Sequence, residues 1–90
     1  GLDTAALHAR IAADPADLAA RLSLADALAA AADYRGALGQ LLEVVRRDRA
    51  YEDDAGRKGM LRLFTMLAED PAQTPLVREF RSALAGCLNR

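Results

Sequence analysis

The side chains that could carry out chemistry are few and widely spaced in this chain. Cys87 is the single cysteine, so it has no Cys-x-x-Cys partner, and His8 is the single histidine. A structural zinc site takes about four ligands, so His8 predicts no metal centre and is expected to be exposed. Cys87 falls on the apolar stripe of a helix near the C-terminal end. We expect a buried structural thiol there rather than a redox thiol, because reactive cysteines lie in electropositive, partly exposed surroundings.

The acidic run Glu52-Asp53-Asp54 resembles a calcium-binding segment only in composition. It lacks the central glycine and the spaced carboxylates of an EF-hand loop, so helix capping is its expected role. Neither a Ser–His–Asp arrangement nor a glycine-rich phosphate loop is evident. The sequence therefore predicts no catalytic residue, no cofactor site and no metal site, and this chain alone is not expected to be an enzyme.

Charge is nearly balanced, with 12 basic and 13 acidic side chains and a formal net charge of −1. Arg57, Lys58 and Arg62 form a basic row that could meet a partner's carboxylates, and a solvated helix face is the alternative. Acids are mixed with these bases, so a phosphate-binding stripe and nucleic-acid binding are not expected. No apolar run approaches the roughly 18 residues that span a membrane, so no membrane partner is expected. The lone cysteine fits a reducing, cytoplasmic setting.

Apolar residues recur with helical spacing through almost the whole chain. The sequence predicts one all-α domain over residues 1–90. Its five helices are expected at residues 4–13, 15–32, 34–48, 55–69 and from 74 to about 88. We expect Asp17 inside the first turn of the second helix, Asp33 as the N-cap of the third, and Asp53 or Asp54 as the N-cap of the fourth.

Two glycines, Gly36 and Gly39, fall inside the third predicted helix. Each costs roughly 1 kcal/mol relative to alanine in a helix interior. The end of the second helix, residues 27–32, has only one large side chain, Leu28. Tight packing of the two glycines against this small-residue segment is therefore the expected compensation.

Apolar and small residues follow a set order between positions 18 and 37, namely Leu18, Leu24-Ala25, Leu28, Tyr34 and Ala37. A shift of 34 positions also pairs Leu7 with Leu41 and Ile11 with Val45. This order resembles a tetratricopeptide repeat, in which helical hairpins stack side by side and present surface to partners. The resemblance implies an antiparallel α-hairpin stack of half a repeat, one full repeat and a divergent helix pair. An ordinary antiparallel helical bundle is the alternative.

The repeat resemblance places four residues at inner positions of the second helix: Ala19, Leu22, Asp26 and Ala29. A groove of this composition is apolar with one acid. It should favour an apolar or basic segment of a partner over an acidic tail.

The apolar stripe of the last helix is broad, and no following repeat is expected to cover it. We therefore expect partner contact through Leu76, Val77, Phe80, Leu84 and Leu88. The alternative is that the same face forms the seam of a homodimer.

A second resemblance rests on a longer series of residues, of which the run 46–64 is the most specific part. The series includes Asp14-Pro15, Tyr34-Arg35-Gly36-Ala37-Leu38, the run 41–49, Asp53-Asp54, Arg57-Lys58, Leu63-Phe64 and Phe80-Arg81. It resembles the C-terminal helical domain of the thioredoxin-like co-chaperone family, the YbbN or chaperedoxin type. That resemblance implies a longer protein whose N-terminal thioredoxin-fold domain would carry any redox activity. It also implies that the helical domain binds a chaperonin or unfolded client proteins.

Overall fold

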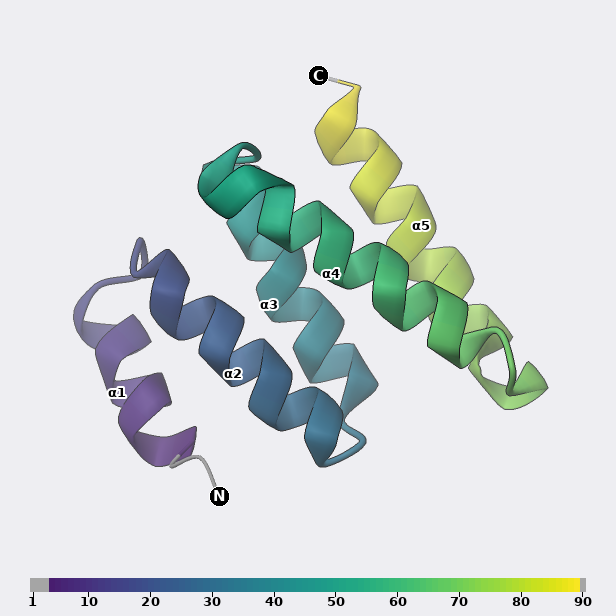
Figure 1. Ribbon diagram of the computed structural model, residues 1–90, viewed down its shortest axis with the longest axis horizontal. Coiled ribbons are helices and arrows are strands. Elements are labelled where there is room, and N and C mark those ends of the chain that lie inside the picture. Colours follow the sequence, from purple (N-terminus) through teal and green to yellow (C-terminus); the bar gives the residue numbers. More distant parts are fainter. Residues whose placement is uncertain (1–3, 90) are drawn as a thin grey trace.

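The computed structural model describes residues 4–89, and all its regular elements are helices (Figure 1). In chain order they are α1 (Thr4–Ala13), α2 (Leu18–Ala30), α3 (Tyr34–Arg47), α4 (Tyr51–Leu67), the single-turn 3-10 helix η1 (Pro71–Gln73) and α5 (Thr74–Leu88). The predicted all-α class with five main helices is confirmed for this part of the chain. None of these helices is long and apolar enough to cross a membrane.

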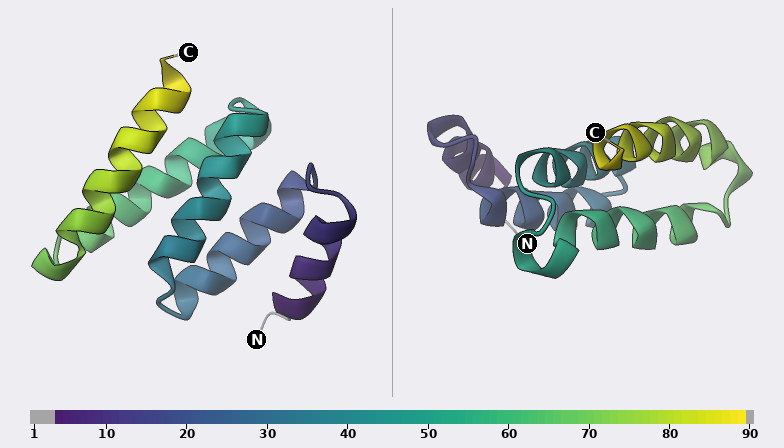
Figure 2. Two further views of the ribbon diagram at one scale, coloured as in Figure 1. Left: turned by 180° about the vertical axis from the view of Figure 1, so that it is seen from behind. Right: turned by 90° about the horizontal axis from the view of Figure 1, so that it is seen from above.

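The helices form two layers, which separate when the molecule is seen from above (Figure 2). One layer contains α2 and α4, and the other contains α1, α3 and α5. Successive helices are antiparallel and joined by short connections (Figure 1). The predicted stack of α-hairpins is therefore present.

Helix α3 is the centre of the stack because its apolar face is the broadest. Its buried residues are Ala37, Leu38, Leu41, Leu42, Val44 and Val45. Four of them belong to the main core, together with Met60, Phe64 and Leu67 from α4 and Phe80 and Leu84 from α5. A second, smaller cluster joins Leu7 of α1 to Ala20 and Leu24 of α2.

The second helix begins later and ends earlier than its sequence predicts. Asp17 is its N-cap, because its carboxylate accepts a hydrogen bond from the backbone N–H of Ala20 at 3.0 Å. Asp14 accepts from the N–H of Ala16 in the same way, so the segment before Leu18 forms a turn. At the other end Ala32 is left-handed, with φ of 63°, and terminates the helix. The expectation that Asp17 lies inside the first turn is therefore wrong.

The start of α4 also differs from the prediction. Neither Asp53 nor Asp54 caps the helix, since the N-cap position is Ala50 and carries no side-chain hydrogen bond. Instead Glu52, Asp53 and Asp54 are all left-handed, with φ between 50° and 63°, and right-handed geometry follows them. The two aspartates bind side chains of the next turn rather than backbone amides. Asp53 pairs with Lys58 at 2.9 Å, and Asp54 with Arg57 at 3.4 Å.

The face of α5 that was expected to be open is partly covered by the protein itself. Phe80 and Leu84 are only 7% and 5% exposed and lie in the main core. The expectation that their side chains are exposed is therefore wrong, because α5 packs across both α3 and α4. Leu76, Val77 and Leu88 are half-buried at the margin of that core, and partner contact through them stays a prediction.

An exposed ion pair fastens the start of α3 to α5. The guanidinium of Arg35 donates two hydrogen bonds to the carboxylate of Glu79, at 2.7 and 3.0 Å. The same guanidinium lies 5.8 Å from the centroid of the Phe80 ring. These hydrogen bonds lower the pKa of Glu79 and raise that of Arg35.

The glycines that allow close helix packing are on α4 rather than on α3. A β-carbon at Gly56 would lie 3.0 Å from the carbonyl oxygen of Leu41, and one at Gly59 would lie 3.0 Å from a methyl group of Leu41. A β-carbon at Gly39 would meet nothing within 4 Å, and one at Gly36 would meet only the capping carboxylate of Asp33. The expected tight packing of Gly36 and Gly39 against the second helix is therefore wrong.

We predict opposite effects of alanine at two of these glycines. Gly39→Ala should raise the free energy of unfolding by about 1 kcal/mol, because alanine is the better helix former and has room there. Gly56→Ala should lower it by about 1–3 kcal/mol, because a backbone carbonyl cannot yield to the added methyl group. Urea unfolding followed by circular dichroism measures both values. Equal effects of the two substitutions would contradict the assigned packing.

The Arg35–Glu79 pair predicts a measurable titration. Glu79 has its pKa lowered in the folded chain, so the pair stabilises the fold at neutral pH and loses that contribution as the pH falls through the lowered pKa. Arg35→Gln should raise the pKa of Glu79 toward the ordinary glutamate value, as read from its side-chain carboxyl carbon by NMR. Arg10→Gln, which removes an exposed pair with Asp17 at the other end of the stack, should leave the pKa of Glu79 unchanged.

Candidate binding groove

An open groove of about 240 Å³ lies between the two helices of the α2–α4 layer. One wall is α2, through Leu22, Ala25, Asp26 and Ala29. The other wall is α4, through Ala55, Gly59, Arg62 and Leu63. Leu41 of α3 also lines it and is 5% exposed, so the second layer supplies the floor.

Four of the wall residues are alanine or glycine, so they leave space between the two helices. Ala25 and Ala29 bring no bulk into the groove from α2, and Ala55 and Gly59 bring none from α4. Gly59 is buried because α4 approaches Leu41 so closely. The groove is therefore a direct result of the helix spacing that the small residues allow.

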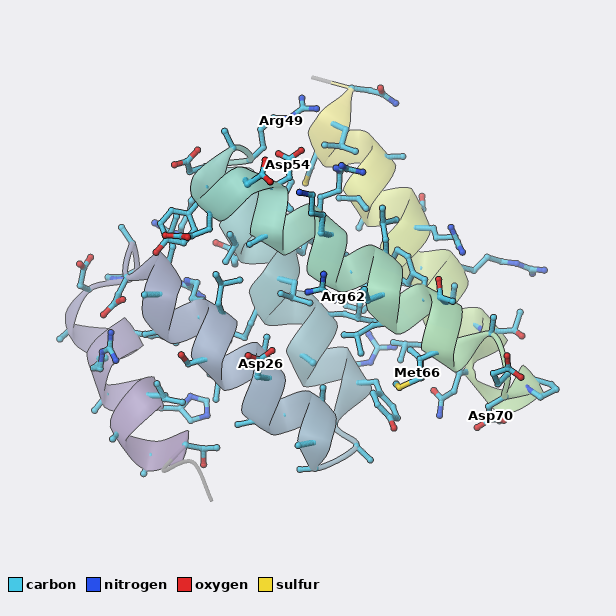
Figure 3. The ribbon with its side chains drawn as sticks, in the orientation of Figure 1. Asp26, Arg49, Asp54, Arg62, Met66 and Asp70 are labelled. Atoms are coloured by element: carbon cyan, nitrogen blue, oxygen red, sulfur yellow. The ribbon has the colours of Figure 1, made fainter. Side chains whose placement is uncertain are left out.

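Two opposite charges face the groove from its two walls. Asp26 on α2 and Arg62 on α4 are both exposed, and Figure 3 shows both side chains on the face of the molecule that is turned toward the reader. Neither side chain forms an ion pair or hydrogen bond with another of residues 4–89. An apolar floor between an unpaired acid and an unpaired base suits a peptide that carries both charges beside an apolar side chain.

The basic row predicted on α4 divides into two parts in the structure. Arg57 and Lys58 pair with Asp54 and Asp53 at the start of the helix, so local acids occupy them. Arg62 lines the groove. Two of the three bases are thus paired locally and one lines the groove, and partner contact through them stays a prediction.

Three of the four inner positions predicted on the second helix line the groove, namely Leu22, Asp26 and Ala29. Ala19 is exposed but does not line it. Ala55, Gly59 and Leu63 were not predicted to line it. Gly59 lies three positions and Ala55 seven positions before Arg62, so helical spacing is the signal that could have found these two, whereas Leu63 directly follows Arg62.

Arg21 is a buried cation that no sequence pattern predicted. It is 8% exposed, and its guanidinium donates to the carbonyl of Pro15 and to the side-chain oxygen of Gln40, both at 2.9 Å. Both acceptors are uncharged, so Arg21 ties the α1–α2 connection to α3 without an acid. This is a structural role, away from the groove.

The remaining reactive side chains form no site. His8 is exposed, as expected, whereas Cys87 is half-buried beside the main core rather than fully buried. Within the described residues, no group of three or more His, Cys, Asp or Glu side chains is placed to hold a metal ion.

Comparison with known proteins agrees with this architecture. A family model described as tetratricopeptide repeat matches residues 1–89, nearly the whole chain. The curated proteins and the solved structures that were compared gave no match. Domains of this repeat type mediate protein–protein interaction and are typically not catalytic. The two-layer stack, the groove between α2 and α4 and the family match lead to one conclusion: the chain belongs to the tetratricopeptide repeat family.

Proposed function

We propose that this domain is the protein-binding module of a cytoplasmic, thioredoxin-like co-chaperone, and that it binds unfolded client segments or a chaperonin through the α2–α4 groove. The single observation that carries the proposal is the groove itself, with its apolar floor and its two unpaired charges, Asp26 and Arg62. The longer protein would supply a thioredoxin-fold domain and with it any redox chemistry. The residue series from Asp14-Pro15 to Phe80-Arg81 that resembles the chaperedoxin type supports this part.

The chemistry of the groove fits an unfolded segment better than a uniformly acidic tail. Leu22, Leu41 and Leu63 offer apolar contact, which exposed apolar side chains of an unfolded protein can satisfy. Asp26 would accept a hydrogen bond from a basic residue of the segment, and Arg62 would donate to an acidic one. Mixed charges of this kind are common in unfolded sequences, so the groove discriminates weakly between clients.

The proposed role predicts that filling the groove abolishes binding. Ala29→Arg places a long side chain in the groove, because Ala29 lines it and does not belong to the buried core. Ala19→Arg adds the same side chain on the exposed part of the same helix, outside the groove, and is the matched control. The probe is fluorescently labelled, reduced α-lactalbumin, which stays unfolded, and the readout is fluorescence anisotropy.

We expect Ala29→Arg to weaken binding by about tenfold or more and Ala19→Arg to leave it unchanged. Both variants should keep the helical circular dichroism spectrum. Undiminished binding by Ala29→Arg would remove the groove from the proposal, and equal loss in both variants would indicate a nonspecific charge effect.

The alternative function is homo-oligomerisation through α5. The half-buried Leu76, Val77 and Leu88 at the edge of the main core favour it, whereas Phe80 and Leu84 are already used inside the protein. We expect a single monomeric species in sedimentation velocity over a hundredfold range of concentration, because the apolar surface left on α5 is small. A concentration-dependent dimer that Val77→Asp dissociates would favour the alternative instead.

A further inference from the structure

A second cavity, of about 320 Å³, lies where α4 meets α5, at the end of the stack away from α1. Its lining residues are Leu67, Ala68, Thr74, Val77, Arg78 and Arg81. It shares no lining residue with the α2–α4 groove.

The two arginines of this cavity differ from most other basic side chains because no acid or carbonyl group of the described residues binds them. Within residues 4–89, the other basic side chains bind an acid or a carbonyl group of the protein, with one further exception, Arg62 in the groove. Arg78 and Arg81 form no ion pair or hydrogen bond within the same residues, and both are exposed. Each of the three arginines without such a partner therefore lines a cavity.

Two acids near these arginines in sequence bind other groups of the domain. Glu79, between the two arginines in sequence, binds Arg35 on α3. Asp70, at the end of α4 in Figure 3, accepts a hydrogen bond from the N–H of Ala72. No acid of the described residues forms an ion pair with Arg78 or Arg81, so both guanidinium groups can bind a carboxylate from outside the domain.

Arg81 is also held in place before any ligand arrives. Its guanidinium carbon lies 4.9 Å from the centroid of the Phe64 ring, and Phe64 is 1% exposed and therefore fixed in the core. A guanidinium that stacks on a ring keeps its N–H groups free at its edges, where they can bind a carboxylate in two places. Leu67 and Val77 provide an apolar surface beside it.

We propose that this cavity is a second docking site and that its occupant is an acidic and apolar peptide segment of a protein partner. A carboxylate of the segment binds between Arg78 and Arg81, and a neighbouring apolar side chain packs on Leu67 and Val77. Both charged residues that line this cavity are basic, whereas the α2–α4 groove carries one acid and one base, Asp26 and Arg62. One domain can therefore hold two partner segments of different charge at the same time.

The test uses the whole chain, labelled with ¹⁵N, and a synthetic eight-residue peptide of alternating leucine and glutamate with both ends blocked. We expect amide shifts on titration at Thr74, Val77, Arg78 and Arg81. Arg78→Gln should weaken peptide binding by about tenfold, because one charge-assisted contact is lost. Arg62→Gln, the equivalent change in the groove, should leave the affinity unchanged, and so should Ala29→Arg. A peptide with glutamine in place of glutamate should not bind.

Arg81→Lys is the second variant. It keeps the positive charge but loses the planar guanidinium that stacks on Phe64, so it should weaken peptide binding less than Arg78→Gln does. The proposal is overturned if the shifts map to the groove, if the glutamine peptide binds equally well, or if Arg62→Gln and Arg78→Gln weaken binding equally. It is also overturned if a labelled single-stranded oligonucleotide binds this cavity more tightly than the peptide, or if Arg78→Gln changes the oligomeric state without any peptide. If Ala29→Arg leaves α-lactalbumin binding unchanged, the proposed function fails, but the outcomes of this peptide experiment are not affected.

Discussion

The close approach of α4 to α3 is the constraint on which the rest of the structure depends. It exists because Gly56 and Gly59 present no side chain to Leu41, so the two layers meet at backbone distance. That contact brings Met60, Phe64 and Leu67 down onto α3 and makes the main core continuous. It also fixes where α4 stands relative to α2, and hence the width of the groove above Leu41. The same two glycines therefore allow both the contact that stabilises the fold and the shape of the groove. In repeat stacks the shape of the surface generally follows from the packing of adjacent hairpins.

The distribution of charge separates maintenance of the fold from recognition. Most basic side chains bind acids nearby on the same helix, as Arg46 and Arg47 do with Glu43, or across two helices, as Arg35 does with Glu79. Such exposed pairs contribute little each to stability, but they neutralise the surface. Against that background Arg62, Arg78 and Arg81 are conspicuous, because no local acid neutralises them. The net charge of −1 does not reveal this pattern, because it adds the charges of paired and unpaired side chains together.

Much of the fold could be predicted from the sequence, because helical periodicity and the order of large and small residues are local signals. The inner position of Asp26 was predicted from the repeat pattern alone.

The features that could not be predicted depend on which residues lie close together in space. Nothing in the sequence shows that Asp53 and Asp54 bind Lys58 and Arg57 instead of capping, nor that three non-glycine residues turn left-handed. Both Gly39 and Gly56 lie inside helices, but only a β-carbon at Gly56 would be crowded, by Leu41, Val44 and Val45 of α3. The burial of Phe80 followed from where α5 crosses its neighbours, which no local pattern encodes.

The division of the core into two clusters has a dynamic consequence. Helix α1 is attached through Leu7, which packs with Ala20 and Leu24 of α2, and none of these residues belongs to the main core. Detachment of α1 would therefore leave the α2–α5 core intact and require far less free energy than global unfolding. Native-state hydrogen exchange should then divide the backbone amides into two tiers, with those of α1 exchanging through a partial opening. The opened form would uncover Ala20 and Leu24, a surface that matches the α1 of another molecule, and so provides a route to exchange of helices between copies.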